Sequence, residues 1–509
     1  MNAQPHTTPS SGPADAHLRV VDLRGRHLGW DELRRVVPRQ AASSVSAAED
    51  AVRGIIEDVR TRGADALREL AHRFDGVEQD RIRVAPEQIA RAVAELDPAV
   101  RRALETAIAR TRAFAEAQRP RDVEVEVAPG AVLRHRWTAV RRAGLYIPGG
   151  LAVYPSSVVM NVVPAQAAGV ESVVLCSPPQ KEFGGLPHPV ILGAAGLLGV
   201  DEVWAVGGAQ SLAAMALGVT DGQDVLEPVN TLTGPGNIFV ATAKRQLRSL
   251  VGVDAEAGTT EIAVLADESA DPRFVAADLI SQAEHDPVAG SVLITDSPDL
   301  ARAVERELSA QVPEARHFER ITTALGGPQS GVVLTDGLEQ SIDVADAYAA
   351  EHLEIHTRDA REVAARVRNA GAIFVGPYSP VPLGDYAAGS NHVLPTGGTA
   401  VFASGLQAAS FMKAVQVVEY TREALAELEE DIVALSGSED LPAHGRAVAL
   451  RSEDHVAEGA HGAAGSAAAP SATPRSTPGA EDDPASRAGD AARVPGAPGT
   501  GSPDTHGKG

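Results

Sequence analysis

Hydrophobic and polar positions follow two different periods along this chain, and the change between them separates its predicted elements. The segments 49–74 and 86–118 carry apolar residues at helical spacing with charged residues between them, which predicts a helical N-terminal region. At Ala143 the pattern changes to short apolar runs separated by amphipathic stretches. Short runs of this kind that alternate with helical segments indicate βαβ units and a parallel sheet.

The alternation occurs in two blocks. The first extends to about Val251 and predicts a strand and turn at 144–150, strands at 172–176 and 202–206, and helices at 157–168, 190–198 and 209–217. The second predicts strands at 261–266, 291–295, 331–334, 353–356 and 372–375, and helices at 274–280, 297–311, 341–350 and 358–369. The fold class that follows is α/β, with two doubly wound, Rossmann-like domains and a cleft between them.

The two ends of the chain differ from these blocks. Beyond Gly397 the pattern is helical again, over 405–418 and 422–435. The segments 1–17 and 451–509 are rich in small and polar residues without any periodicity, so we expect a disordered lead and a disordered, solubilising tail.

Composition narrows the range of partners and compartments. A formal net charge of −23 over 509 residues argues against nucleic acid or an anionic membrane as a partner, because such binding needs clustered Lys and Arg. One anionic cofactor held by backbone dipoles remains possible. Cys176 is the only cysteine and closes an apolar run, which indicates a small buried residue. The absence of a disulfide and of an apolar membrane segment predicts a cytoplasmic protein.

Gln282 and His285 are the first candidates for chemistry. They follow a predicted helix that opens with Asp271-Pro272 and that Pro287 should end. Their spacing of three residues places both side chains on one helix face, so both can contact the same object. A metal ion is one interpretation. A polar helix end that faces solvent is the other, and this segment alone favours it, because one imidazole and one amide make a poor metal site.

Two glycine-rich stretches, 207–210 and 233–237, each precede a predicted helix. Their backbone N–H groups and the following helix N-terminus could bind a pyrophosphate. The GxGxxG fingerprint of a dinucleotide site is absent, so structural turns are an equally good interpretation of either stretch.

A carboxylate and an imidazole stand side by side at Glu351-His352, where a predicted helix passes into a strand. Strand ends border the ligand crevice of a doubly wound sheet, so the pair is suited to acid–base chemistry. The alternative is a solvated edge formed with Glu354 and His356. Asp385 lies on a predicted loop, and His444 is isolated near the end of the ordered chain.

Six separated motifs occur together in one order, and on them the chain resembles the histidinol dehydrogenase family. The motifs are Gly144-Leu145-Tyr146-Ile147-Pro148-Gly149-Gly150, Val206-Gly207-Gly208-Ala209-Gln210, Gly234-Pro235-Gly236-Asn237, Ser281-Gln282-Ala283-Glu284-His285, Glu351-His352-Leu353-Glu354 and the run from Gly384 to Pro395. The resemblance covers about Leu18 to Arg451. It implies the NAD-dependent, four-electron oxidation of L-histidinol through L-histidinal to L-histidine in histidine biosynthesis.

The resemblance also implies the roles of particular residues. One zinc ion per subunit would be bound by Gln282, His285, Asp385 and His444, and would orient the substrate without redox chemistry of its own. Glu351 and His352 correspond to the acid–base pair; we assign His352 to the hydroxyl proton and Glu351 to water activation. The implied NAD contacts are Tyr146, Gln210 and Asn237. The implied substrate contacts are Thr260, Gln282, His285, His352, Asp385, Glu439 and His444.

Domains and assembly follow from the same resemblance. Residues 144–258 would form the NAD-binding α/β domain, and 18–143 would pack with 259–396 as the substrate and zinc domain. Residues 397–450 would form a C-terminal dimerisation arm. Glu439 and His444 would reach the partner subunit's site, so the active sites of a homodimer would be shared.

The chain departs from the family pattern at a few positions. Thr260 lies in Gly258-Thr259-Thr260-Glu261, where many members have Gly-Pro-Ser-Glu, and Asp440 replaces a common glycine. Two other functions are less consistent with these residues. A related dehydrogenase for another small alcohol, such as sulfopropanediol, is disfavoured because a sulfonate would need a cation where Glu439 stands. A non-catalytic zinc-binding dimer should have lost the acid–base pair, and the pair is present.

Overall fold

The computed structural model describes residues 18–39, 45–149, 153–255 and 258–461. It divides into two compact units, Met1–Tyr420 and Thr421–Gly509, and each is described here by itself. The predicted lead at 1–17 lies outside the described residues, and so does the predicted tail from 462 onward. The helix α18 (Pro442–His461) continues past Arg451, where we expected the tail to begin.

The first block forms a five-stranded parallel sheet. Its strand order is β10 (Gly252–Val253), β9 (Thr231–Thr233), β4 (Arg142–Tyr146), β5 (Ser172–Ser177) and β6 (Val203–Ala205). The connections include α6 (Pro155–Ala168), α7 (Pro189–Leu197), α8 (Gly208–Leu217), α9 (Ile238–Leu247) and the hairpin β7 (Val219–Asp221) and β8 (Asp224–Leu226). Cys176 is buried in β5, as its apolar context predicted, and burial raises the pKa of its thiol.

The N-terminal helices cover this first sheet. On one face, α4 (Pro86–Ala94) and α5 (Pro98–Ala117) pack with α6 and α7; on the other, α2 (Val45–Arg62) and α3 (Ala64–Asp75) pack with α8 and α9. We had expected 18–143 to pack with 259–396, and of its described elements only β1 (Val20–Asp22) and α1 (Trp30–Val36) pack with the sheet of that segment. An amphipathic pattern shows which face of a helix is buried, but it does not show which sheet buries that face.

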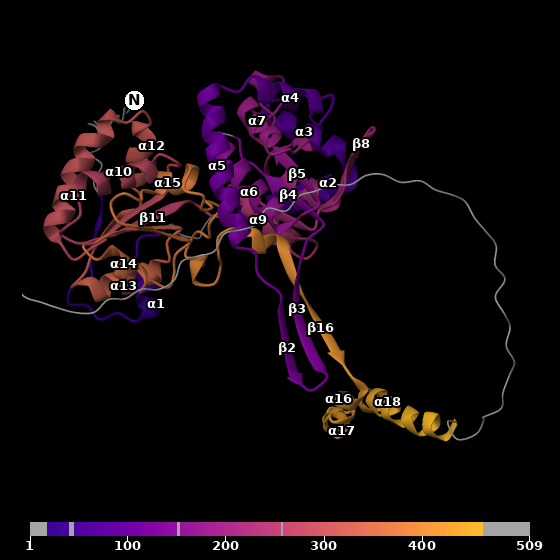
Figure 1. Cartoon of the computed structure of the whole chain (residues 1–509). Coiled ribbons are helices and arrows are strands. Elements are labelled where there is room, and N and C mark those ends of the chain that lie inside the picture. Colours follow the sequence, from indigo (N-terminus) through magenta and orange to yellow (C-terminus); the bar gives the residue numbers. More distant parts are fainter. Residues whose placement is uncertain (1–17, 40–44, 150–152, 256–257, 462–509) are drawn as a thin grey trace, which may run out of the picture. The chain divides into compact units, whose positions relative to one another are not determined.

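The second block forms a six-stranded parallel sheet. Its order is β1 (Val20–Asp22), β13 (Gly331–Leu334), β12 (Gly290–Thr295), β11 (Glu261–Ala266), β14 (His352–His356) and β15 (Ala372–Val375). One face packs against α10 (Pro272–Ala283), α11 (Pro298–Gln311) and α12 (Phe318–Leu325), and the other against α1 (Trp30–Val36), α13 (Leu338–Tyr348) and α14 (Ala360–Ala364) (Figure 1). The predicted α/β class with parallel sheets is confirmed.

A third sheet has three antiparallel strands, in the order β16 (Met412–Tyr420), β3 (Ala131–Ala139) and β2 (Val123–Ala128). The helix predicted over 405–418 is therefore wrong. The run Met412–Tyr420 is rich in valine, whose branched side chain favours a strand, and the whole run pairs with β3. That partner lies almost 300 residues earlier in the chain, so local spacing could not reveal it.

Several predicted helices are interrupted or shorter than expected. The segment 49–74 is divided at Gly63, whose φ is +55°, and 86–118 is divided where Asp97 caps a new helix by accepting from the amides of Ala99 and Val100. The helix expected over 358–369 is reduced to α14. Short 3-10 helices occupy Lys181–Phe183, Val312–Glu314, Thr399–Val401 and Ala408–Phe411.

The second unit is helical. It contains α16 (Arg422–Ala426), α17 (Glu429–Ser438) and α18, so the helix predicted over 422–435 is divided. Asp440 follows α17 with a φ of +57°, a left-handed conformation that glycine adopts freely and that aspartate tolerates better than most residues. Throughout the described ranges, the helices lack the combination of length and apolar character that crossing a lipid bilayer requires.

Candidate active site

The candidate acid–base groups lie where the order of the second sheet reverses. From β11 the chain proceeds to β12 and β13 on one side and then returns to β14 on the other, which makes β11 and β14 the switch-point strands. Thr260 and Glu261 stand at the start of β11, and Glu351 and His352 at the start of β14. Ligands of doubly wound sheets usually bind at the carboxyl ends of the strands. Here these groups gather at the amino ends.

Glu351 is a buried carboxyl with two donors. Its Oε2 accepts from the Thr260 hydroxyl at 2.5 Å and from the Glu261 amide at 3.0 Å. Burial raises the pKa of Glu351 to about 8, although both hydrogen bonds favour the ionised form. Glu354 and His356 are also buried, so the alternative of a solvated edge is wrong.

His352 is buried beside this carboxyl as a neutral imidazole. Its Nδ1 lies 3.6 Å from Glu351 Oε2, and its Nε2 lies 3.9 Å from Asp385 Oδ1. Neither ring nitrogen makes a hydrogen bond with the described residues. Burial lowers the pKa of His352 to about 4, which leaves a ring nitrogen able to accept a proton at neutral pH.

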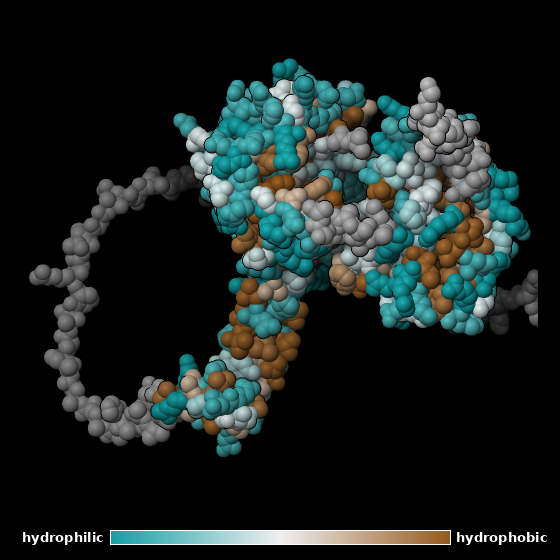
Figure 2. Space-filling model, turned by 180° about the vertical axis from the view of Figure 1, so that it is seen from behind, coloured by the Kyte–Doolittle hydropathy of each residue, from teal (hydrophilic) through white to brown (hydrophobic). Residues whose placement is uncertain are grey.

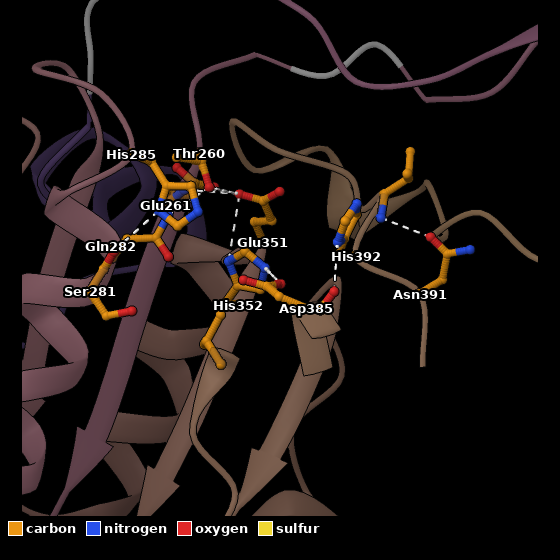
Figure 3. Close-up of polar contacts among 12 residues, drawn as sticks. Thr260, Glu261, Ser281, Gln282, His285, Glu351, His352, Asp385, Asn391 and His392 are labelled. Carbon is orange, nitrogen blue, oxygen red and sulfur yellow. Dashed lines mark hydrogen bonds and ion pairs between the residues drawn. The ribbon is translucent and has the colours of Figure 1, made fainter. Parts of the chain in front are cut away.

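The end of α10 supplies Gln282 and His285. Asp271 caps the helix start as predicted, by accepting from the Arg273 amide, but the helix ends at Ala283, before Pro287. His285 lies in the following turn, where its amide donates to the Gln282 carbonyl at 3.2 Å. Gln282, His285, His352 and Asp385 are grouped around the same space (Figure 3).

Gln282 and His285 each keep one side-chain atom available as a ligand within this group. The Gln282 side-chain nitrogen donates to the Thr260 hydroxyl at 2.6 Å, while its buried Oε1 makes no hydrogen bond with the described residues. His285 Nδ1 contacts the Ser281 carbonyl at 3.1 Å, which directs the ring and leaves Nε2 for another partner. The threonine hydroxyl thus links Gln282 to Glu351, and its extra methyl group does not prevent this contact.

Asp385 completes the group from α15 (Val381–Tyr386), and burial raises the pKa of its carboxyl. Its backbone carbonyl contacts His392 Nδ1 at 3.1 Å, and His392 Nε2 lies 3.0 Å from the Ser157 hydroxyl on α6. Burial lowers the pKa of His392 to about 4. His392 lies within the motif from Gly384 to Pro395 but has no predicted role, because only the fold brings it beside Asp385.

Gln282 Oε1, His285 Nε2 and the Asp385 carboxylate could together hold a metal ion. They offer one nitrogen and two oxygen donors, a set that zinc accepts, and the orphaned Oε1 is a buried acceptor in need of a partner. Glu439 and His444 belong to the second unit, where both side chains are exposed, the first at the C-cap of α17 and the second in the first turn of α18.

The three predicted NAD contacts stand at the carboxyl ends of strands in the first sheet. Tyr146 ends β4, and its hydroxyl accepts from the Gly208 amide at 3.3 Å. Gln210 is buried in the first turn of α8. Asn237 caps α9, and its side-chain oxygen accepts from the amides of Phe239 and Val240. The order of this sheet reverses between β4 and β9, where a doubly wound fold binds its ligand.

The loop before α9 is held by a buried ion pair. Gly234 has a φ of +120°, and a Cβ there would lie 2.0 Å from the Tyr146 carbonyl oxygen, so only glycine fits. Its amide donates to Asp254 at 2.9 Å, and Lys244 donates to both its carbonyl and Asp254. These contacts therefore fix the backbone of the Gly234 loop at the switch point between β4 and β9.

A buried carboxyl–imidazole pair at one switch point and glycine-rich turns at the other fit an α/β enzyme of the dehydrogenase class. A family model described as "Histidinol dehydrogenase" matches residues 38–452. The histidinol dehydrogenase of Nocardia farcinica is 59% identical over 437 residues, which cover 86% of this chain and 98% of that protein. The histidinol dehydrogenase of Thermobifida fusca is 59% identical over 85% of this chain and 97% of that protein.

A solved structure agrees with these relatives. The crystal structure of histidinol dehydrogenase from Elizabethkingia anophelis superposes with a TM-score of 0.80 at 29% identity and covers 86% of this chain and 98% of that one. The chain belongs to the histidinol dehydrogenase family. It is accordingly an oxidoreductase of histidine biosynthesis whose substrate is histidinol, and the resemblance drawn from the six motifs is confirmed.

Proposed function

We propose that the chain oxidises L-histidinol through L-histidinal to L-histidine with two NAD⁺, at a site formed by Glu351 and His352 and by Gln282, His285 and Asp385. The observation that carries this assignment of residues is their convergence around one buried space at the amino ends of β11 and β14. The substrate is a small polar molecule that carries an imidazole, and a buried group of imidazole, amide and carboxyl side chains matches its polarity.

In the proposed chemistry His352 accepts the proton of the substrate hydroxyl, and Glu351 activates water for the second oxidation. A neutral imidazole is the form that accepts a proton, and burial keeps His352 neutral. The carboxyl of Glu351 has its pKa raised to about 8, near working pH, so it can both take and return protons. Thr260 holds this carboxyl in place and is proposed to contact the substrate as well.

One zinc ion per subunit is proposed to be held by Gln282, His285 and Asp385, with His444 of a second copy as the fourth ligand. A bound zinc ion would supply a Lewis acid that orients the nitrogen atoms of the substrate. The orphaned Gln282 oxygen and the directed His285 ring support this assignment. The protein side chains would move the protons.

NAD is proposed to bind at the first sheet. Tyr146, Gln210 and Asn237 lie at its carboxyl edge, beside the fixed Gly234 loop, and this edge carries the helix N-termini of α8 and α9. We therefore propose residues 144–258, together with the helices that cover them, as the NAD-binding domain and residues 259–396 as the substrate domain. Cytoplasm, where NAD and reduced cysteine coexist, is the proposed location.

A homodimer with shared sites is proposed from two observations. The three-stranded sheet exposes apolar side chains on one face, where Val125, Leu133 and Val418 stand opposite one another with 49%, 37% and 66% of their surface exposed (Figure 2). A second copy of this chain is the occupant we propose for that face, within an arm that includes 397–450. Glu439 and His444 are exposed, as side chains that complete a partner's site must be in the isolated chain.

One assay tests the proposed reaction. Full-length protein loaded with zinc is mixed with NAD⁺ and a limiting amount of L-histidinol, and NADH is followed by its absorbance. The proposal predicts two NADH for each histidinol consumed, loss of activity after chelation and recovery after zinc is returned. Absence of NADH, a yield of one, or turnover only of a sulfonated diol would contradict it.

A further inference from the structure

Polar side chains continue along the interior of the second domain, beyond the active site. On β14, residues 352, 354 and 356 alternate along the strand and share one face. On α10 and in the turn that follows it, residues 278, 282 and 285 recur at helical spacing, and α10 packs over this face of the sheet. The proposed active site uses one end of this column. Asp278, Glu354 and His356 form the other end, and the proposed reaction does not use them.

These three side chains converge on one point. His356 Nε2 lies 3.3 Å from Glu354 Oε2 and 3.9 Å from Asp278 Oδ2. One ligand atom from each residue lies within 4.8 Å of the other two. All three residues are buried, with 0%, 4% and 9% of their surface exposed for Glu354, His356 and Asp278. Such convergence of nitrogen and oxygen donors, in the described part of the chain, is the geometry of a small metal site.

Two buried side-chain atoms of this trio, Glu354 Oε2 and His356 Nδ1, make no hydrogen bond with the described residues. Glu354 Oε1 accepts from the Val381 amide at 2.8 Å, but Oε2, the oxygen directed at His356, receives no hydrogen bond from any described N–H or hydroxyl group. A cation, a proton shared with the neighbouring carboxyl of Asp278, or a realigned N–H of His356 Nε2, which lies 3.3 Å away, would satisfy Oε2. A buried carboxylate oxygen left without any of these would destabilise the fold.

The charge of the trio is also uncompensated. No lysine or arginine among the described residues forms an ion pair with Asp278 or Glu354. Burial, followed by the nearby charge of Glu354, raises the pKa of Asp278 to about 8, and burial raises that of Glu354 to about 7. Without a cation the two carboxyls resist ionising together. A divalent ion would reverse this preference, because its charge matches the two carboxylates.

We propose that Asp278, Glu354 and His356 bind a divalent transition-metal ion at a second site, separate from the zinc of the active site. Two carboxylate oxygens and one imidazole nitrogen suit Zn²⁺ or Mn²⁺, whereas Mg²⁺ and Ca²⁺ prefer oxygen ligands alone. Ligands about 2.0–2.1 Å from a tetrahedral zinc ion are separated from each other by roughly 3.3–3.4 Å. The observed separation of 3.3 Å between His356 and Glu354 agrees with that value, and Asp278 would move inward by about half an ångström.

The bound ion would join two elements that carry the active site. Asp278 lies one helical turn before Gln282 on α10, and Glu354 lies two residues after His352 on β14. An ion held by both elements would fix the register of α10 against the sheet, and with it the direction of Gln282 and His285. The role of this second site is thus structural, and the substrate does not reach it.

Metal content tests the proposal directly. Full-length wild type, His356→Leu, Asp278→Asn and Asp385→Asn are loaded with zinc, dialysed and analysed by atomic emission. We expect two zinc ions per chain in the wild type and one in each variant. Asp385→Asn is the matched control, because it removes a buried carboxylate from the active site and leaves the second site intact. Circular dichroism checks folding, and Asp278→Asn serves if His356→Leu fails to fold.

The pattern of losses separates this proposal from that of the active site. Zinc retained in Asp385→Asn should raise its melting temperature by a few degrees, and the double variant Asp385→Asn/His356→Leu should show no such rise. Two zinc ions in both His356→Leu and Asp278→Asn would overturn the second site. A wild type that binds one ion, with none left in Asp385→Asn, would overturn it as well. One ion that His356→Leu removes and Asp385→Asn keeps would support the second site and contradict the proposed active-site zinc.

Discussion

At the scale of single residues, burial determines the protonation of the proposed acid–base pair, Glu351 and His352. In water at about pH 6.5, Glu351 would be charged and His352 would be half protonated, so the two could form an ordinary ion pair. Inside the second domain the pKa of Glu351 rises to about 8 and the pKa of His352 falls to about 4, in each case mainly through burial. Both groups are thereby held near their neutral forms, which suits a base and a reversible proton carrier.

Replacing Glu351 by glutamine tests its role in the reaction. The amide keeps the contact with Thr260 but cannot take a proton, so we expect kcat to fall by about 10²–10⁴ while the KM for NAD⁺ stays near the wild-type value. Steady-state NADH formation measures both constants. Glu284→Gln, which changes an exposed carboxylate near the same site, is the control and should keep kcat. An unchanged kcat in Glu351→Gln would contradict the assignment.

Glu261 gives a prediction about stability and pH. Burial raises the pKa of Glu261 to about 7, with the charge of Arg39 opposing that rise. Because the folded pKa lies above the unfolded value, the native state binds more protons, and stability is lost as pH rises from about 4.5 to about 7. Relative to Glu261→Gln, the wild type should lose about 3 kcal/mol between pH 4.5 and pH 8 in denaturant titrations. Parallel stability curves for the two proteins would count against this account.

At the scale of elements, local pattern predicted much of the parallel architecture. The bounds of β11, β13 and β15 agree with the apolar runs that predicted them. The strand β16 was predicted as a helix because its pairing partner is distant in the chain. Helical spacing joins Gln282 to His285, but no local pattern shows that β14 lies opposite α10. The burial of Glu354 and His356 beside Asp278 therefore could not be predicted from the sequence.

The general rule about sheet edges applies to only one of the two sheets. Tyr146 and Asn237 stand at the carboxyl edge of the first sheet, as the rule requires. Glu351 and His352 stand at the amino edge of the second. The candidate residues therefore lie at strand ends in both sheets, but the direction of the strands does not indicate which end carries them.

The ion pair behind the Gly234 loop should contribute strongly to stability. Lys244 and Asp254 have 2% and 3% of their side-chain surface exposed, so Lys244→Met would leave a buried carboxylate unpaired and cost about 3–5 kcal/mol. Asp254→Asn in the same chain should recover part of the loss, because it removes the uncompensated charge. Urea unfolding of both variants measures this. A loss below about 1 kcal/mol in Lys244→Met would show that the pair does not hold the loop.

At the scale of the whole molecule, distant segments are brought together in ways that no local pattern contains. The helices of 45–117 cover the first sheet, β1 joins the second, and His392 reaches Ser157 on α6. Asp385 lies about a hundred residues after Gln282, and only the family resemblance linked the two from sequence. The structure brings Gln282, His285 and Asp385 together, and it leaves Glu439 and His444 in a separate unit.

The apolar face of the three-stranded sheet predicts how the proposed dimer can be separated. Val125→Lys places a charge beside Leu133 on this apolar face, so we expect monomers with little activity. Light scattering during size-exclusion chromatography measures the oligomeric state. Val415→Lys makes the same change on the opposite face, beside Arg136, and should remain dimeric. Dimers in Val125→Lys would show that the second copy binds elsewhere.

Sharing of sites between subunits is the most specific part of this account, and mixed dimers test it. Glu351→Gln and His444→Ala are each expected to be inactive alone. In a mixed dimer, one site receives an intact Glu351 from one chain and an intact His444 from the other, so equal mixing with subunit exchange should restore about a quarter of wild-type NADH formation. If His444 instead serves its own chain, every site carries one defect, and the mixture stays inactive despite demonstrated exchange.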